Sequence, residues 1–231
     1  MTFSLLARDP ATGDFAAAAA TGSLCVGGWV LRGDVRDGLS AAQGASASTL
    51  WGEAAQAALA RGLRAPDALA TVVDADPGRA SRQLAVLDVG GWSAAFTGAA
   101  NADWRGALAA DDLVVSGNRL AGPAVLDALR DGWLASQGEP LAERLLAALD
   151  AAAAAGGDRQ PLQSAALLVL SRRHAPLTLR IDGDDRPLAA LRALHARTTA
   201  PAYAEWAASV PCLDHPHAPV SAGPSDTGVL P

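Results

Sequence analysis

The stretch Thr2-Phe3-Ser4-Leu5-Leu6-Ala7-Arg8 opens the chain and decides how the rest is expected to fold. It is followed by Asp9-Pro10-Ala11-Thr12-Gly13 and then by a second apolar run at residues 14 to 21. Proline and glycine favour a chain reversal, so the two apolar runs are expected to form an antiparallel hairpin. The first strand of the protein therefore begins with a threonine.

Thr2 is also a candidate nucleophile, because methionine aminopeptidases remove Met1 when a small residue follows it. A threonine at the amino end supplies a hydroxyl group and an α-amine with a pKa of about 7.7–8.0, which can act as the base for that hydroxyl. The alternative is that residue 2 is an ordinary starting residue with no chemistry. Without further observations, a threonine at position 2 favours the reading of an ordinary starting residue.

Hydrophobic periodicity divides the rest of the chain into blocks of strands and helices. Residues 26–32 and 37–43 are expected to be strands, and Thr49 to Leu63 has helical spacing. Pro66 suits the first turn of the next helix, which continues through Val73. The remaining expected elements are strands at 83–89, 92–97, 113–116, 164–170 and 177–181, and helices at 123–134, 140–155 and 187–197.

Strand blocks that alternate with helix pairs indicate an α+β fold with two antiparallel sheets packed face to face. With helices over each outer side, this is a four-layer αββα sandwich. Residues 1–200 are expected to form this one domain. Further along, the chain becomes rich in proline, glycine and serine and loses its periodicity, so residues 201–231 are expected to be an arm or a poorly ordered tail.

Composition excludes several classes of function. The chain of 231 residues carries 18 basic and 24 acidic side chains, and the net charge of -6 argues against nucleic acid or an anionic membrane as partner. No lysine occurs, which excludes any mechanism that needs a catalytic lysine. Two cysteines, no visible signal peptide and no apolar run of about 20 residues together predict a cytoplasmic protein.

Three segments resemble a known family. They are Thr2-Phe3-Ser4-Leu5-Leu6-Ala7-Arg8-Asp9-Pro10, then Ser116-Gly117-Asn118-Arg119-Leu120-Ala121-Gly122, and finally Gly156-Gly157-Asp158 with Gln163-Ser164-Ala165-Ala166-Leu167-Leu168-Val169. They are similar to the bacterial family called domain of unknown function 1028, over residues 2 to about 197. That family is in turn similar to the N-terminal-nucleophile hydrolases, which have the αββα fold.

The resemblance implies roles for six residues. Thr2 would attack an amide carbonyl with its own amine as base, and the backbone N–H of Gly44 or its neighbour would hold the oxyanion. Asn118 or Ser116 would steady the terminal amine, and Asp158 and Ser164 match positions that orient the groups around the nucleophile. The alternatives are an ordinary turn at Gly44, a turn or helix cap at Asn118, a solvated loop residue at Asp158 and a strand edge at Ser164.

The sequence lacks a lysine that the family pattern includes. Proteasome-like sites use a lysine near the third strand, and many family members have one soon after the second strand, where this chain has Thr21-Gly22-Ser23. Arg32 lies near the required place and would act only as a fixed cation, because arginine stays protonated. Thr21, Ser116 and Arg32 are thus the candidates for substrate binding, with a surface charge at a strand end as the alternative for Arg32.

No metal or cofactor is expected. His215 and His217 lie close to Cys212 and Asp214, but the intervening proline and the position in the tail favour an incidental exposed segment. Cys25 is expected to be buried on a strand rather than reactive.

Two hypotheses follow from these observations. The first is a hydrolase that cleaves a small amide with Thr2 after Met1 is removed. The second is a catalytically silent binding or assembly module of the same fold, with Met1 retained. A homo-oligomer is expected in either case, because the chain has a proline-rich arm.

Overall fold

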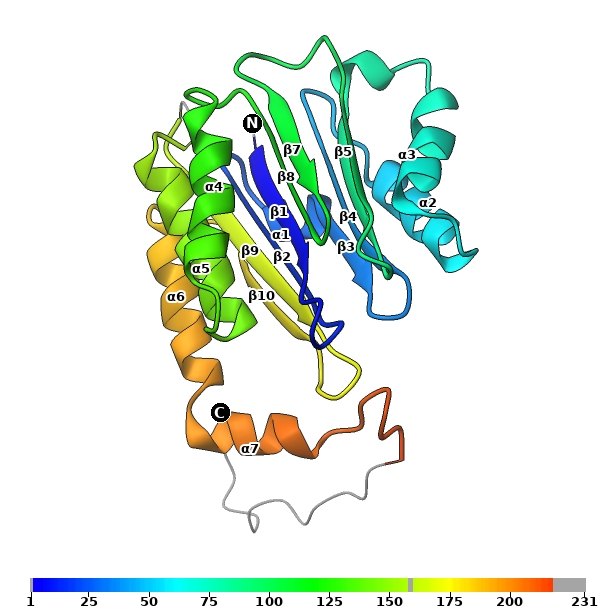
Figure 1. Cartoon of the computed structure of the whole chain (residues 1–231). Coiled ribbons are helices and arrows are strands. Elements are labelled where there is room, and N and C mark those ends of the chain that lie inside the picture. Colours follow the sequence, from blue (N-terminus) through cyan, green and yellow to red (C-terminus); the bar gives the residue numbers. More distant parts are fainter. Residues whose placement is uncertain (1, 158–159, 218–231) are drawn as a thin grey trace.

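The computed structural model describes residues 2–157 and 160–217, which form two antiparallel sheets, seven α-helices and one 3₁₀ turn (Figure 1). The strands are Thr2–Arg8 (β1), Phe15–Thr21 (β2), Leu31–Asp34 (β3), Gly38–Gln43 (β4), Gln83–Asp88 (β5), Ser93–Thr97 (β6), Gly106–Ala110 (β7), Leu113–Asn118 (β8), Ser164–Leu170 (β9) and Leu177–Ile181 (β10). The helices are Val26–Trp29 (α1), Thr49–Ala60 (α2), Ala65–Asp74 (α3), Ala124–Ala135 (α4), Leu141–Ala154 (α5), Pro187–Thr198 (α6) and Pro201–Ser209 (α7), with the 3₁₀ turn at Arg79–Ser81.

The larger sheet has the strand order β10-β9-β2-β1-β8-β7 and the smaller one β3-β4-β5-β6. Helices α4, α5 and α6 lie along the outer face of the larger sheet, and α2 and α3 lie along the outer face of the smaller one (Figure 1). The sheets face each other across a shared apolar layer. The predicted α+β class with two antiparallel sheets is therefore confirmed, and β1 lies in the interior of the larger sheet.

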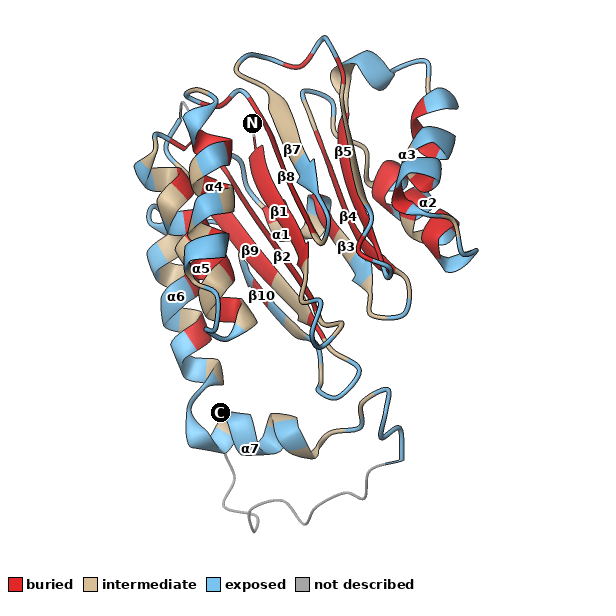
Figure 2. Ribbon diagram, in the orientation of Figure 1, coloured by how far each residue is buried: buried red, intermediate tan, exposed pale blue. Residues whose placement is uncertain are grey.

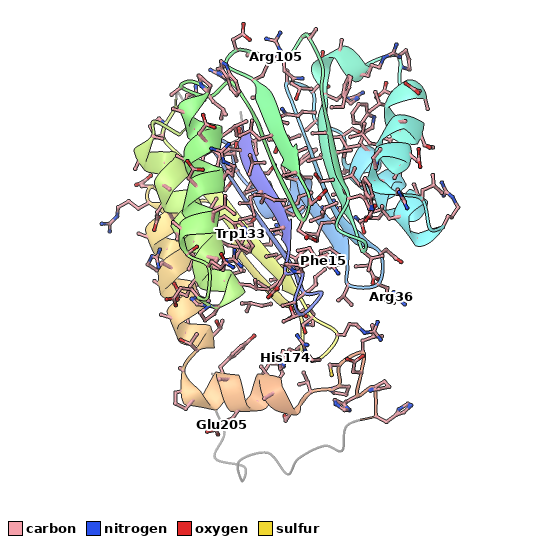
Figure 3. The ribbon with its side chains drawn as sticks, in the orientation of Figure 1. Phe15, Arg36, Arg105, Trp133, His174 and Glu205 are labelled. Atoms are coloured by element: carbon pink, nitrogen blue, oxygen red, sulfur yellow. The ribbon has the colours of Figure 1, made fainter. Side chains whose placement is uncertain are left out.

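Strand β1 is buried along almost its whole length because both of its faces are covered. Phe3 and Leu5 point toward the helices, whereas Leu6 points into the layer between the sheets. The neighbouring strand β2 contributes small side chains, and Figure 2 shows that these central strands are buried along most of their length. In Figure 3, Phe15 marks the layer between the sheets and Trp133 marks the core under α4.

The prediction of a strand over residues 26–32 is wrong. Residues Val26–Trp29 form the short helix α1, and β3 begins only at Leu31. The reason is close packing: a Cβ atom at Gly27 would lie 2.7 Å from the Cβ of Ala166 and 2.8 Å from the Cγ of Arg180. The apolar spacing of this segment reflects a helical turn tucked against β9, which periodicity does not separate from a strand over so few residues.

Two elements are absent from the sequence-based prediction. Strand β7 is a partly exposed edge strand of small residues, which gives a weak signal. Helix α7 lies inside the segment predicted to be an arm, and none of its residues is buried (Figure 2). Among the described residues, no helix is long and apolar enough to cross a membrane.

Candidate active site at the start of β1

The start of β1 lies in a row of polar residues at one end of the larger sheet. Thr2 is paired with Asn118 on β8, and Thr21 on β2 is paired with Ser164 on β9. The residue after Thr2 is paired with the residue before Thr21, so Thr2 and Thr21 are neighbours on adjacent strands. The structure thus brings together, from four strands, residues that the sequence analysis names separately.

The Thr2 hydroxyl is held by the row rather than free. Its Oγ1 donates to Oγ1 of Thr21 at 3.3 Å, and the residue is only 8 % exposed. Met1 lies outside the described residues. Thr2 does not line either of the two cavities described below.

The layer between the sheets changes from apolar to polar along β1. Side chains on one face of a strand recur every second residue, so Leu6, Ser4 and Thr2 share the face toward the smaller sheet. Leu6 lies among apolar residues, whereas the Oγ of Ser4 lies 3.0 Å from the Oγ of Ser116 on β8. The amino end of β1 is thus the polar end of an otherwise apolar layer.

Gln83 is the central residue of this polar end, and sequence reasoning missed it. It is fully buried at the first position of β5. Its Oε1 accepts hydrogen bonds from Nε2 of Gln43 at 2.8 Å and Nδ2 of Asn118 at 3.1 Å. Its Nε2 lies 2.8–3.0 Å from three acceptors, the hydroxyl of Thr97 and the carbonyls of Gly106 and Gly117. Gln83 therefore ties the two sheets together and orients the amide of Asn118 beside Thr2.

Gln43 continues this network from β4. Its Nε2 lies 3.4 Å from the Oγ of Ser116 as well as 2.8 Å from Gln83. Its Oε1 is buried and has no hydrogen-bond partner among the described residues. A buried acceptor without a donor costs stability, so this atom is available to an amide N–H or a water molecule that enters the layer. The sequence offers only a weak signal for these two residues, a glutamine at one terminus of each of two strands.

The turn after β4 places Gly44 as the sequence analysis expected, between a strand and the segment that leads to the first long helix. Gly44 has φ +132°, and a Cβ there would lie 2.7 Å from the carbonyl oxygen of Ser81, so only glycine fits. Of the two backbone donors considered for the oxyanion, the N–H of Ala45 already donates to Oδ1 of Asn101 at 2.7 Å. The N–H of Gly44 is then the better candidate.

The same turn is held from outside by a charged pair. Nε of Arg82 donates to Asp76 at 2.5 Å, and Nη1 of Arg82 donates to the carbonyl of Ser46 at 2.5 Å. The Arg82 guanidinium, with a smaller contribution from the N–H of Gly78, holds the pKa of the Asp76 carboxyl below its ordinary value. The pair restrains the residues that follow Gly44.

Asp76 should therefore make stability depend on pH in the acid range. Because its pKa is lowered in the folded chain, its contribution is complete above the unfolded value of about 3.9 and is lost as the pH falls through the folded value. We expect urea unfolding to show the wild type more stable than Asp76→Asn at pH 6, with the difference shrinking below pH 4. A difference that stays constant from pH 6 to pH 3 would contradict this assignment.

Ser164 and Arg32 make contacts that support the fold rather than the polar end of the layer. The Oγ of Ser164 donates to the carbonyl of Ser23 at 2.7 Å and accepts from the N–H of Val26 at 3.1 Å, so it anchors the loop before α1. Arg32 faces α2, where its Cγ lies 3.2 Å from the Cβ position of Gly52, and its Nη1 donates to its neighbour's carbonyl. Arg32 is therefore on the other face of the smaller sheet from the polar end. Asp158 lies outside the described residues.

The remaining candidates do not join this site. Among residues 2–157 and 160–217, no group of three or more histidine, cysteine or acidic side chains is placed to hold a metal ion. Cys25 and Cys212 are free thiols, and Cys25 lies before α1 in a left-handed conformation rather than on a strand. His195 is buried on α6, with Nδ1 3.1 Å from Glu143.

The fold and the polar end together define a class, an α+β protein of two antiparallel sheets in which the first residues of the central strand line a buried polar layer. The chain belongs to the family of unknown function DUF1028, whose model matches residues 2–191. It is similar to the crystal structure of protein SPO2555 from Silicibacter pomeroyi, described as a DUF1028 protein. The two share 47 % identity and a TM-score of 0.90, over 95 % of this chain and 99 % of that one. No curated protein matches. The predicted resemblance to DUF1028 is thereby confirmed.

Proposed function

We propose that the chain is a hydrolase of the N-terminal-nucleophile type with the four-layer αββα architecture, and that it cleaves a small amide. One observation carries the proposal: Thr2 is the first residue of a central strand, with its hydroxyl inside a row of hydroxyl and amide side chains. A nucleophile needs neighbours that fix its hydroxyl and steady the developing charge, and Thr21 and Asn118 lie beside it on the two adjacent strands.

Besides the substrate and one water molecule, the proposed reaction uses only groups of this chain. The free α-amine of Thr2 takes the hydroxyl proton as Oγ1 attacks the amide carbon, and the carbonyl oxygen becomes an oxyanion held by the N–H of Gly44. The ammonium then returns the proton to the leaving nitrogen, and the C–N bond breaks to leave an ester on Thr2. Water, activated by the same amine, hydrolyses this ester and restores the hydroxyl.

Removal of Met1 is a requirement of this mechanism. While Met1 is attached, the nitrogen of Thr2 belongs to a peptide bond and is not basic, so the hydroxyl has no base. The low exposure of Thr2 adds a second requirement, since a substrate can reach Oγ1 only if the processed chain uncovers it. The absence of lysine leaves the amine itself as the group whose pKa sets the activity.

The test compares one chain in two forms. The protein is produced with an amino-terminal leader that a specific protease removes, which leaves Thr2 as the first residue. Half of the sample is kept uncleaved. Both forms are screened against primary amides, peptides and N-acyl amino acids, with intact mass recorded for each. We expect turnover only in the form with a free Thr2. Equal turnover in both forms, or none in either form across the panel, would contradict the proposal.

A second candidate is favoured by one observation, the burial of Thr2 with its hydroxyl already hydrogen-bonded to Thr21. In this alternative the chain is a catalytically silent binding or assembly module that retains Met1. It predicts that protein from the native host carries Met1 in full, and that the form with a free Thr2 is inactive. Intact-mass measurement distinguishes the two candidates before any substrate is known.

We also propose that the protein is a cytoplasmic homo-oligomer. Helix α7 supports the oligomeric part, because it has only nine residues, buries none of them and exposes half of Trp206. A helix of this length is marginal in water without a packing partner. A second copy of the chain would supply one.

A further inference from the structure

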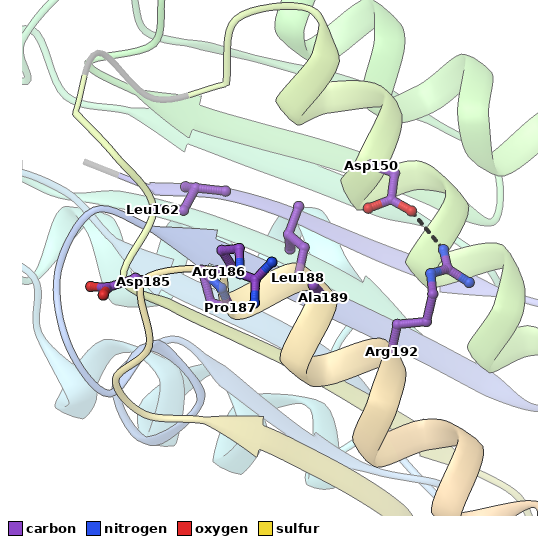
Figure 4. A pocket seen from close by; sticks show the side chains of 8 residues that line it. All are labelled: Asp150, Leu162, Asp185, Arg186, Pro187, Leu188, Ala189 and Arg192. Atoms are coloured by element: carbon purple, nitrogen blue, oxygen red, sulfur yellow. Dashed lines mark hydrogen bonds and ion pairs between the residues drawn. The ribbon is translucent and has the colours of Figure 1, made fainter.

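Two adjacent cavities meet at the start of α6. They have volumes of about 540 and 560 Å³, and Asp185 and Arg186 line both of them. The first lies between α5 and α6 and is lined largely by apolar side chains, among them Leu162, Pro187 and Leu188 (Figure 4). The second is more polar and reaches Gln163. We refer to the two together as the α6 groove.

Arg186 is a cation of the α6 groove that has no ion-pair partner in the described part of the chain. Asp150 and Arg192 at its far end form an ion pair of 2.6 Å, so their charges are matched. Within residues 2–157 and 160–217, the guanidinium of Arg186 and the carboxylate of Asp185 make no hydrogen bond or ion pair that would neutralise them. Only backbone groups of Arg186 are used: its N–H donates to Oδ1 of Asp184 at 2.7 Å, and its carbonyl accepts from the N–H of Ala190 at 3.0 Å. Figure 4 shows these two side chains pointing away from each other.

The charges and the apolar side chains of the α6 groove together indicate the class of ligand that it would bind. A guanidinium binds a carboxylate through two parallel N–H groups, and Leu162 and Leu188 offer apolar surface next to Arg186. Asp184 and Asp185 on the polar side would repel a second negative charge. A molecule with a single carboxylate and one apolar substituent satisfies all three conditions.

The α6 groove lies at the same end of the larger sheet as Thr2. The N–H of Gln163, on the polar side of the groove, donates to the carbonyl of Thr21 at 2.9 Å, and Thr21 is next to Thr2 on the adjacent strand. Neighbouring strands are about 4.8 Å apart, so Gln163 lies two strand spacings, or roughly 10 Å, from Thr2. Because α6 packs on the outer face of the larger sheet and the side chain of Thr2 is on the face toward the smaller sheet, a ligand held at Arg186 would have to pass around the end of the larger sheet to reach the polar row.

We propose that the α6 groove binds small apolar monocarboxylates of the N-acyl amino acid class, with Arg186 taking the carboxylate. Binding of such a ligand is independent of any chemistry at Thr2. The further step, that the groove holds the carboxylate end of the substrate whose amide is cleaved, rests on the proposed function.

The test measures binding to the full chain carrying Thr2→Val, which cannot hydrolyse the probe by the proposed route. The probe is N-acetyl-leucine. Its binding is measured by titration calorimetry and by the changes in amide chemical shifts. Three comparison ligands test the three conditions: N-acetyl-leucinamide lacks the carboxylate, acetate lacks the apolar group, and N-acetyl-glutamate has a second negative charge in place of the apolar side chain. Arg186→Gln removes the guanidinium, Ala189→Trp fills the groove, and Arg197→Gln, on the last turn of the same helix, is the matched control.

We expect N-acetyl-leucine to bind saturably. Each comparison ligand should bind at least about tenfold more weakly than N-acetyl-leucine, and Arg186→Gln should weaken binding of N-acetyl-leucine by the same factor. Arg197→Gln should leave that affinity unchanged. Binding should also weaken as salt is raised, since the contact is exposed. Equal binding of N-acetyl-leucinamide, retention in both Arg186→Gln and Ala189→Trp, or shifts confined to residues outside the groove would overturn the proposal. Because the probe is bound without turnover, a failure of the hydrolase proposal would leave this result unchanged.

Discussion

Replacing Thr2 by alanine in the processed chain is expected to remove turnover of any amide substrate, by on the order of 10⁴-fold or more. The substitution removes the attacking oxygen and keeps the terminal amine, so the base has no hydroxyl to activate. Thr2→Ser keeps both groups and should retain measurable activity. The measurement is the rate of amide cleavage by the two variants and the wild type, each with its amino end verified by intact mass.

The matched control is Thr178→Ala, which makes the same change at an exposed position of β10. It should leave the rate unchanged. The pH profile gives a second readout, because the only proposed base is the α-amine, with a pKa of about 7.7–8.0. Substantial turnover by Thr2→Ala would exclude Thr2 as nucleophile, whichever reaction the protein catalyses.

Replacing Gln83 by leucine is expected to destabilise the chain by about 3–5 kcal/mol. The side chain of Gln83 is fully buried and bonds groups on both sheets, so its loss leaves amide donors on Gln43 and Asn118 without an acceptor. A loss of this size is a large part of the total stability of a typical domain. The measurement is the free energy of unfolding in urea, with circular dichroism at low denaturant to verify folding.

Gln137→Leu is the matched control, since Gln137 is exposed after α4 and should change stability by less than about 0.5 kcal/mol. The double variant Gln83→Leu with Thr97→Val tests the contact between Gln83 and Thr97. Because the two side chains are partners, their effects should not add. Equal unfolding energies for Gln83→Leu and Gln137→Leu would show that the polar end does not hold the sheets together.

Much of the fold could be read from local pattern. The hairpin of β1 and β2 follows from two apolar runs around a proline and glycine turn, and its register places Leu6 opposite Ala17 in the buried layer. The class and most elements follow in the same way, because spacing of apolar residues and turn residues act over a few positions. Segment 26–32 is one exception, beside the missed elements β7 and α7, since its helical form depends on contact with β9 and β10.

Some residues of the candidate site could be predicted from the sequence, and others could not. Thr2 could be named from its position at the start of the first strand, and Gly44 and Asn118 from the resemblance to a known family. Gln83 and Gln43 could not, since a glutamine at a strand end has no distinctive spacing and its function depends on which sheet faces it. Arg32 was named from its distance along the chain, but the side chain lies on the other face of its sheet, beside α2.

The sequence by itself determined that this chain forms two antiparallel sheets with helices, that it begins with a strand carrying Thr2, and that lysine chemistry is excluded. Only the tertiary structure decided that residues from β1, β2, β5 and β8 meet in one buried polar layer, and that Arg186 lies beside Leu162 and Leu188 with no ion-pair partner among the described residues. The physical reason is that local patterns fix which face of a strand is apolar. Which polar groups are buried against each other depends on contacts between residues far apart in the chain.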